Sequence, residues 1–234
     1  YFAVDLAIFL VEFVIDTLYT DWYNGVRKKM LLCFREGRRK SLDNREAILQ
    51  TALKLFCARG YDAVGVQEIV DQAGITKPTL YYYFGSKRGL LEEILRSNSE
   101  ILENRLREAV EIPGQVPEVL YRVARAYFDF AGSHWQFYLF MLSQFYAGRE
   151  TEGFRAVYPL IHKYYELVVR IFEDAADMLG NMRGRQEQFA VSFMGILDSH
   201  MMMLGREREE TARLVMTDEK TYEIVHQFLH GIYS

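Results

Sequence analysis

Two short helix-forming segments separated by a glycine constrain this chain more than any other part of it. The first, residues 67–74, reads Gln-Glu-Ile-Val-Asp-Gln-Ala-Gly, and the second, residues 75–91, has Pro78 in its first turn after Thr76, a good capping residue. Gly74 permits a tight turn between them, because glycine adopts left-handed backbone conformations readily. Together they predict a helix-turn-helix over about residues 65–84, the layout of a DNA-reading motif.

The second segment also carries groups suited to nucleic acid. Three consecutive tyrosines, Tyr81–Tyr83, stand close to Lys77 and Lys87. Tyrosine hydroxyls and lysine ammonium groups are good donors to phosphate oxygens, and lysine can also bind base edges. The same segment holds Leu80 and Phe84, which we interpret as core residues of a small helical domain.

The remainder of the chain favours helices. Half of its 234 residues are apolar and only four are prolines. Long stretches repeat apolar residues at spacings of three and four, which is typical of amphipathic helices. We therefore predict an all-α protein, with an N-terminal three-helix helix-turn-helix domain followed by a larger helical domain.

Charge is distributed unevenly along the chain. The net charge is −4, but residues 27–45 hold eight Lys/Arg against two acids, whereas residues 97–234 hold 14 bases and 20 acids. Local rather than net charge governs attraction to nucleic acid, and the basic stretch lies just ahead of the predicted motif. A basic run can also be plain solvated surface; beside a helix-turn-helix pattern, the DNA-binding interpretation is favoured.

The predicted domains are 1–40, an N-terminal extension, 41–96, the DNA-binding domain, and 97–234, where the composition turns acidic. Ile101 is assigned to the buried face of a helix over residues 86–110. Ser133 to Gln136 form a capping-box pattern that would start a helix. Pro159 is an alternative start for the helix expected over 154–179. The helices are expected over about 44–60, 66–74, 77–85, 86–110, 117–131, 133–148, 154–179, 185–205 and 218–232.

The N-terminal residues 1–23 predict an apolar helix with one acidic stripe. A membrane span is disfavoured because each central acid costs about 2.5–3.5 kcal/mol on insertion, and no basic residue precedes the run as in a signal peptide. Docking on a partner of the same dimer is favoured over contact of residues 1–29 with a membrane surface, aided by the basic residues 27–29. Residues ahead of Met30 could also precede the natural start. The stripe consists of Asp5, Glu12 and Asp16.

No cofactor or metal site is predicted. Cys33 and Cys57 belong to no metal or disulfide pattern, and Cys57 is interpreted as a small core residue of a protein in a reducing cytoplasm. His226 and His230 have the spacing of a metal pair but lack a supporting carboxylate motif. No nucleophile elbow, phosphate loop or carboxylate pair favours an enzyme.

Residues 44–92 resemble the TetR/AcrR family of transcriptional regulators. The resemblance covers well under a third of the chain, but many positions agree at the correct spacing. Gly65 departs from it, since the family commonly has Thr or Ser as that helix cap. The matching residues are Arg45-Glu46-x-Ile48-Leu49-x-x-Ala52-x-x-Leu55-Phe56-x-x-x-Gly60, then Ile69-Val70-x-x-Ala73-Gly74-Ile75-x-Lys77-x-Thr79-Leu80-Tyr81-x-Tyr83-Phe84-x-Ser86-Lys87-x-x-Leu90-Leu91.

The resemblance implies a DNA-binding role for two sets of residues. Those expected to face bases in the major groove of operator DNA are Gln67, Lys77, Pro78, Thr79 and Tyr81. Those expected at the phosphate backbone are Thr76, Tyr82, Tyr83 and Lys87, together with Arg38 and Arg39, which with Lys40 form an arm along the backbone or in the minor groove.

The resemblance further implies a homodimer through the helices near 185–205 and 218–232, and a small-molecule effector enclosed by the middle helices. An apolar pocket would suit a hydrophobic or aromatic effector, although aromatic residues at helical spacing more often form core. The expected function is a repressor released by its effector; the alternative is a structural or division-control DNA-binding protein without a ligand. The pocket candidates are Phe128, Trp135, Phe140, Tyr165, Phe193 and His200, with Phe137, Phe145, Tyr158, Phe172 and Met194 as further material.

Overall fold

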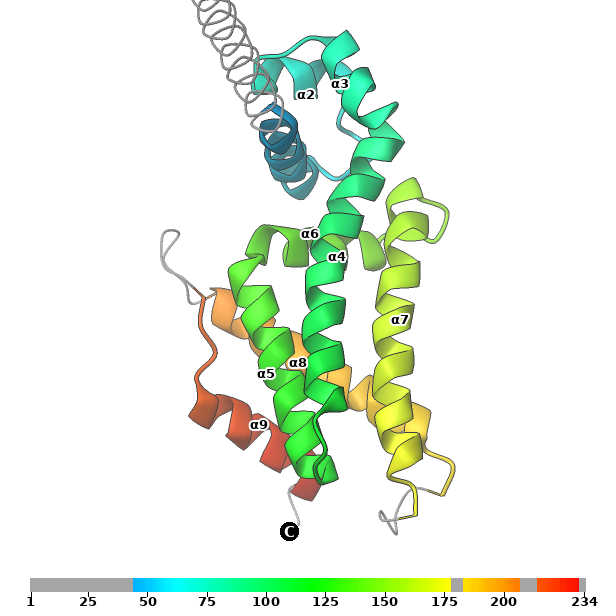
Figure 1. Cartoon of the computed structure of the whole chain (residues 1–234), viewed down its shortest axis with the longest axis vertical. Helices are drawn as coiled ribbons and strands as arrows, with labels where there is room; N and C mark the ends of the chain where they lie inside the picture. Colours follow the sequence, from blue (N-terminus) through cyan, green and yellow to red (C-terminus); the bar gives the residue numbers. More distant parts are fainter. Residues whose placement is uncertain (1–43, 178–182, 207–213, 232–234) are drawn as a thin grey trace, which may run out of the picture. The chain divides into compact units, whose positions relative to one another are not determined.

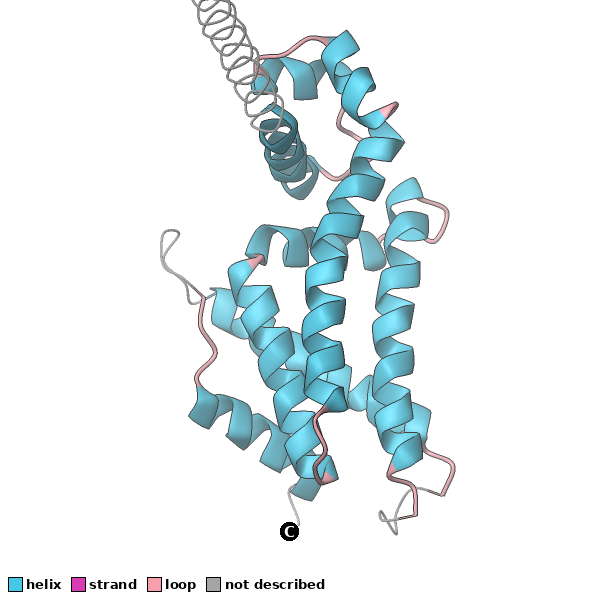
Figure 2. Ribbon diagram, viewed as in Figure 1, coloured by secondary structure: helices cyan, strands magenta, loops and turns pink. Residues whose placement is uncertain are grey.

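The computed structural model describes residues 44–177, 183–206 and 214–231, and these contain helices and no strand (Figures 1 and 2). From residue 49 onward they form one compact unit, to which the contacts below belong. The predicted N-terminal extension, with Arg38 and Arg39, lies outside the described residues. The all-α prediction is confirmed for the part of the chain that can be followed.

The predicted helix-turn-helix is present. A helix over residues 44–59 precedes α2 (Val66–Ala73) and α3 (Lys77–Phe84). Gly74 ends α2 with a φ of 65°, the left-handed conformation that closes such a turn at little cost in glycine. The Thr76 hydroxyl then accepts a hydrogen bond from the Thr79 N–H (3.4 Å), and Pro78 stands in the first turn of α3. Gly65 precedes α2 without a side-chain cap, as expected from its lack of a hydroxyl.

Helix α4 (Lys87–Glu111) is long and continuous. Ser86 caps it by accepting a hydrogen bond from the Gly89 N–H at 2.9 Å. The helix passes without a break through residue 97, so the domain boundary placed there stays a prediction. Ile101 is 37% exposed, and its assignment to the buried face is wrong: the inward stripe runs through Leu102 and Leu106 instead.

Five further helices complete the unit. Helix α5 packs against α4 and α9, and α7 packs against α4, α6 and α8, so α4 lies between α5 and α7 (Figure 1). The core consists of aromatic and aliphatic side chains that these helices bury. Their bounds are α5 (Val116–Ser133), α6 (Trp135–Phe145), α7 (Glu152–Asp174), α8 (Gln186–Arg206) and α9 (Asp218–His230).

Two predicted helix starts are wrong. The Ser133 hydroxyl donates to the backbone carbonyl of Asp129 inside α5, so it is not available as the cap of α6, which follows His134 without a side-chain cap. Helix α7 starts at Glu152 after Thr151, whose hydroxyl accepts from the Phe154 N–H at 3.2 Å. Pro159 therefore lies within α7; it is exposed there, so the carbonyl left without a helical donor can be hydrated.

None of the helices in the described ranges combines the length and the apolar character needed to cross a membrane.

Candidate nucleic-acid interface and ligand cavities

Helix α3 exposes one polar and aromatic face. Lys77 and Pro78 are exposed at its start, and Tyr81 and Tyr82 are 46% and 80% exposed. Leu80, between them in the sequence, is completely buried. A partner that covers large exposed tyrosines buries their apolar rings, which stabilises the complex. This face is therefore suited to binding.

Three of the predicted DNA-contacting residues, Gln67, Thr76 and Thr79, have side-chain hydrogen bonds within the chain. The hydroxyls of Thr76 and Thr79 lie 2.9 Å apart, which holds the half-buried Thr79 beside the start of α3. Gln67 is exposed on α2, and its amide donates to an Asp71 carboxylate oxygen at 2.7 Å. Gln67 would have to exchange this bond for one to a base edge if it reads DNA.

Tyr83 and Phe84 are half-buried at the end of α3. The Tyr83 ring meets Tyr82 edge to face, with the centroids 5.1 Å apart. Tyr83 therefore packs against the exposed Tyr82 ring.

Lys87 lies at the start of α4 above an aromatic ring. Its ammonium nitrogen is 4.1 Å from the centroid of the Tyr61 ring, a cation–π distance. Partial burial lowers the pKa of Lys87, while the acids Asp62 and Glu152 raise it. Sequence reasoning missed Tyr61, which is buried in the structure, because no spacing rule links it to Lys87.

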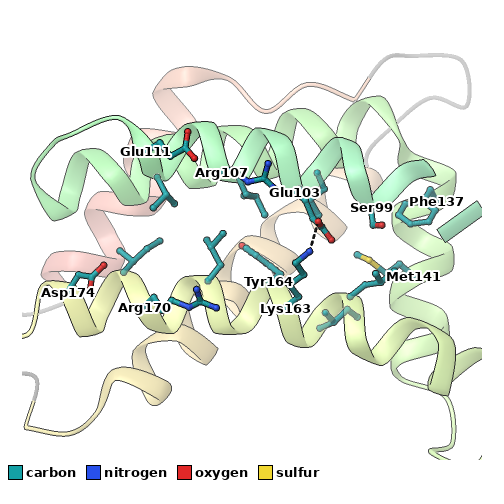
Figure 3. Close-up of a pocket in the computed structure, with 17 residues that line it drawn as sticks. Ser99, Glu103, Arg107, Glu111, Phe137, Met141, Lys163, Tyr164, Arg170 and Asp174 are labelled. Carbon is teal, nitrogen blue, oxygen red and sulfur yellow. Dashed lines mark hydrogen bonds and ion pairs between the residues drawn. The ribbon is translucent and has the colours of Figure 1, made fainter. Parts of the chain in front are cut away.

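A first cavity, cavity A, lies between α4 and α7 and has a volume of about 340 Å³ (Figure 3). Its interior is apolar, with Leu102 and Leu106 from α4 facing Leu160, Leu167 and Ile171 from α7. Charged side chains complete the lining: Arg107, Lys163, Arg170, Glu103, Glu111 and Asp174. A cavity with apolar walls and charged side chains in its lining suits an amphipathic ligand.

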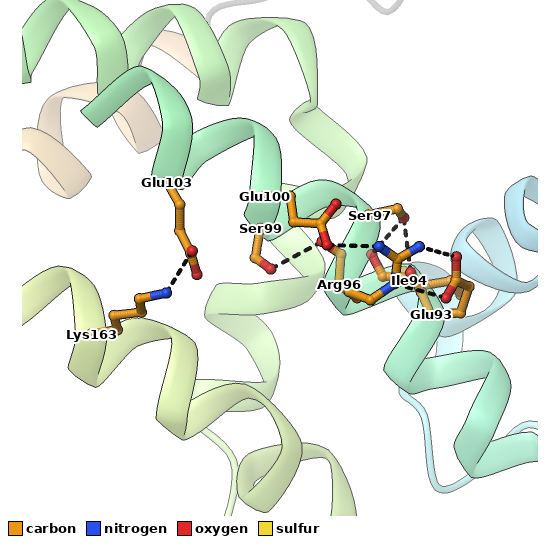
Figure 4. A network of polar contacts seen from close by, with 8 residues as sticks. All are labelled: Glu93, Ile94, Arg96, Ser97, Ser99, Glu100, Glu103 and Lys163. Carbon is orange, nitrogen blue, oxygen red and sulfur yellow. Dashed lines mark hydrogen bonds and ion pairs between the residues drawn. The ribbon is translucent and has the colours of Figure 1, made fainter. Parts of the chain in front are cut away.

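One ion pair joins the two helices across cavity A. The Lys163 ammonium group of α7 lies 2.5 Å from a Glu103 carboxylate oxygen of α4 (Figures 3 and 4). The two arginines of the lining, Arg107 and Arg170, stand on opposite helices. A ligand that separates α4 from α7 would have to break the ion pair.

A second cavity, cavity B, has a volume of about 260 Å³ and an aromatic lining that includes Tyr127, Tyr158 and Tyr165. Asp198 of α8 also lines it and accepts hydrogen bonds on one carboxylate oxygen from the hydroxyls of Tyr127 and Tyr138, the latter at 2.9 Å. Burial raises the pKa of Asp198, and these two hydrogen bonds oppose the shift.

Tyr164 stands at the wall between the cavities, since it lines both of them together with Met141 and Ile161. Its hydroxyl is buried and has no hydrogen-bond partner within the described residues. Its ring stacks on Tyr127 with a centroid distance of 5.1 Å. A buried hydroxyl without a partner is costly and rare in folded proteins.

Comparison with known proteins agrees with this geometry. Residues 48–94 match the family model described as bacterial regulatory proteins, tetR family. The transcriptional activator FasR of Mycolicibacterium smegmatis is 36% identical over 97 residues, which are 41% of this chain and 44% of FasR, so the chain matches less than half the length of that relative. This part of the chain is therefore similar to the corresponding segment of tetR-family regulators.

Solved structures extend the similarity beyond the helix-turn-helix. A putative fatty acid metabolism regulator of Clostridium perfringens is 25% identical, with a TM-score of 0.69 over 80% of this chain and 99% of that protein. FadR of Bacillus subtilis, solved with stearoyl-CoA, has a TM-score of 0.64 over 80% and 99% at 16% identity, a likeness of fold alone. The chain therefore shares its fold with these two regulators over about 80% of its length.

The residues predicted for the effector pocket are distributed between the core and the two cavities. Tyr165 lines cavity B, as do Phe145, Tyr158 and Met194, while Phe137 lines cavity A. Neither cavity is lined by the other pocket candidates: Phe128, Phe140, Phe193 and Phe172 are buried, and Trp135 and His200 are half-buried. The sequence analysis did not identify Asp198 and Tyr164 as lining residues. Their only signal in the sequence is that they are polar groups on largely apolar stretches of helix.

Polar residues interrupt the middle of α4 next to cavity A. Asn98 donates to the Ile94 carbonyl at 2.9 Å, and the hydroxyls of Ser97 and Ser99 donate to carbonyls of the preceding turn, at 2.8 Å for Ser97 (Figure 4). Arg96 counteracts this by pairing with Glu93 and Glu100, both at 2.7 Å. Side chains that bond back to helical carbonyls slightly weaken and often bend a helix, so this turn of α4 is weakened.

Proposed function

We propose that this protein is a homodimeric repressor that binds a palindromic operator through α3 and is released by a small-molecule effector. The observation that carries the proposal is the exposed face of α3, on which Lys77, Tyr81 and Tyr82 stand free while Leu80 anchors the helix. In this arrangement Gln67, Lys77, Pro78, Thr79 and Tyr81 read bases, and Thr76, Tyr82, Tyr83 and Lys87 hold phosphates.

The dimer would form through α8 and α9. Both helices expose large apolar side chains, among them Val191 and Met203 on α8 and Tyr222 on α9. Apolar groups on two neighbouring helices favour a second copy of the chain as partner. Such a dimer would present two α3 helices to successive major grooves, about 34 Å apart on the DNA.

We assign the effector to cavity A and propose a hydrophobic molecule with an anionic head, such as a fatty acyl-CoA. The apolar walls of α4 and α7 suit an acyl chain, and Arg107 and Arg170 suit a carboxylate or phosphate. FadR, which shares the fold, binds stearoyl-CoA. The proposed setting is the cytoplasm, where operator DNA and acyl-CoA meet.

The sign of regulation is a separate part of the proposal. FasR is named an activator, whereas other matched relatives are named repressors. A dimer that covers two major grooves blocks other proteins from that DNA, so repression needs no further contact. An activator would instead require a surface for the transcription machinery.

The test of DNA reading is selection of bound duplexes from a random pool by the full chain. We expect enrichment of an inverted repeat whose half-sites are about one helical turn apart. The double variant Lys77→Ala/Thr79→Ala, which leaves Leu80 and the hydrophobic core intact, should select a different or degenerate repeat. Recovery of unenriched DNA by the wild-type chain would contradict sequence-specific reading.

The alternative is a structural or division-control DNA-binding protein of the same fold without a ligand. Octanoyl-CoA and stearoyl-CoA, with free coenzyme A as the control, distinguish the two. Release of the selected duplex by an acyl-CoA but not by coenzyme A favours the repressor. If neither acyl-CoA binds or releases the duplex, the alternative is favoured.

A further inference from the structure

Cavity B differs from cavity A in the charge that it presents. Among its described lining residues there is no lysine or arginine, and Asp198 is the only carboxylate. Cavity A, in contrast, is lined by three bases and three acids: Arg107, Lys163, Arg170, Glu103, Glu111 and Asp174. The two cavities share a wall, but only cavity B has a lone acid without a lysine or arginine in its described lining.

Asp198 is a half-buried acid without a cation beside it among the described residues. Its described hydrogen-bond partners, Tyr127 and Tyr138, are neutral hydroxyls, and no ion pair with it occurs among the described residues. A carboxylate shielded from water is costly to ionise unless it is paired with a positive charge. A cation bound in cavity B would supply that charge and favour the ionised form of Asp198.

The walls of cavity B add aromatic faces to this charge. The rings of Tyr158, His162 and Tyr165 stack in sequence along α7, with centroids 5.5 and 5.8 Å apart and planes 10° and 20° from parallel. All three line the cavity, as does Phe145. Aromatic faces attract cations and also stack on flat rings.

Tyr164 also lines cavity B, as it does cavity A, and its buried hydroxyl has no hydrogen-bond partner among the described residues. An unpartnered buried hydroxyl is rare in folded proteins, so this shared wall is an unusual part of the core.

We propose that cavity B is a binding site for a flat aromatic cation, held between the aromatic side chains of α7 and the carboxylate of Asp198. This site is separate from the acyl-CoA site proposed for cavity A. Its occupancy can be measured on the protein alone, so its failure would leave operator binding and acyl-CoA release untouched.

The first experiment compares three probes of similar size by calorimetry on the full chain: the cation 1-methylquinolinium, its neutral isostere 1-methylnaphthalene, and the anion 1-naphthoate. We expect the cation to bind at least tenfold more tightly than the neutral probe, and the anion to bind most weakly. Equal binding of cation and neutral probe, or preferred binding of the anion, would overturn the proposal.

The second experiment uses Asp198→Asn, which keeps the size of the side chain and an oxygen that can accept from Tyr127 and Tyr138. The affinity for 1-methylquinolinium should fall about tenfold or more, and that for 1-methylnaphthalene should stay within about twofold. Asp174→Asn, which removes a carboxylate from the lining of cavity A, is the matched control and should change neither. Equal losses in the two variants would show that overall charge and not this site attracts the cation, which would overturn the proposal; the comparison of the three probes decides it if Asp198→Asn does not fold.

Discussion

Residues close together in the sequence of α3 have opposite environments. Leu80 is completely buried, whereas Tyr82, two residues later, is 80% exposed. A helix turns about 100° per residue, so side chains two positions apart lie on nearly opposite faces. The burial of Leu80 therefore fixes the position of the short α3, while Tyr81 and Tyr82 stay exposed for the proposed contact with DNA.

Lys87→Met should weaken binding to every DNA sequence and lower the salt slope of log affinity by about one. Methionine keeps the aliphatic stem on the Tyr61 ring, so the loss reports the charge rather than packing. Salt titrations of the selected duplex and of an unrelated duplex measure both effects. A loss confined to the selected duplex would contradict the phosphate-binding role, and Arg88→Met, whose guanidinium pairs with Glu92, is the neighbouring control.

Tyr164→Phe should raise the free energy of unfolding by about 1 kcal/mol, because it removes a buried hydroxyl that has no partner. Tyr138→Phe is the matched control; it removes a hydroxyl that donates to Asp198 and should lower the same quantity by about 1–2 kcal/mol. Urea titrations of the two variants give the comparison. Equal destabilisation would mean that the Tyr164 hydroxyl is satisfied in solution.

At the scale of helices, α4 connects α3 to cavity A. Ser86 at its start follows α3 directly, and residues from Ser99 to Glu111 line the cavity. Between these parts lies the turn weakened by Ser97, Asn98 and Ser99. The proposed ligand of cavity A would therefore alter the direction of α4 at this weakened turn.

Ser97→Ala with Asn98→Ala should stiffen that turn. Alanine is the better helix former, so the free energy of unfolding should rise by about 1 kcal/mol. The factor by which octanoyl-CoA weakens operator binding should shrink. Ser143→Ala in α6, where the serine makes the same kind of bond to the Phe140 carbonyl, should leave that factor unchanged; an unchanged factor in the α4 variant would show that this turn does not transmit the signal.

Glu103→Gln should increase the affinity for octanoyl-CoA by up to about fivefold. The substitution removes the ion pair that joins α4 to α7, and exposed pairs contribute roughly 0.2–1 kcal/mol. It also releases the Lys163 ammonium group for an anionic head. Glu100→Gln is the control because Glu100 pairs with Arg96 on the same helix; weaker binding in Glu103→Gln would contradict the placement of the ligand.

The helix-turn-helix could be predicted from the sequence because its signals are local. Gly74, Thr76 and Ser86 each act within one turn of the helix that they end or begin. The cavities could not be predicted from the sequence. Phe140 and Tyr165 are both aromatic residues on amphipathic helices, and only the packing of the helices buries Phe140 in the core and places Tyr165 at cavity B. The predicted cap at Ser133 was wrong for a related reason. Its hydroxyl could bond to either neighbouring helix, and it donates to the Asp129 carbonyl of the preceding one.

At the scale of the whole protein, the proposal links two binding events. Operator DNA would favour the conformation in which two α3 helices match the half-site spacing, and the acyl-CoA would favour another. The proposed dimer through α8 and α9 would make the spacing a property of both copies. A ligand acts on DNA binding only through its different affinity for the two conformations.

The most direct test measures the dissociation constant of octanoyl-CoA with and without a saturating amount of the selected operator. Linkage requires operator DNA to weaken ligand binding by the factor by which the ligand weakens operator binding, and typical couplings are about 5–150-fold. We expect the two factors to agree within error and to lie in this range. An octanoyl-CoA affinity that is the same in the presence and absence of operator would contradict a ligand-responsive repressor.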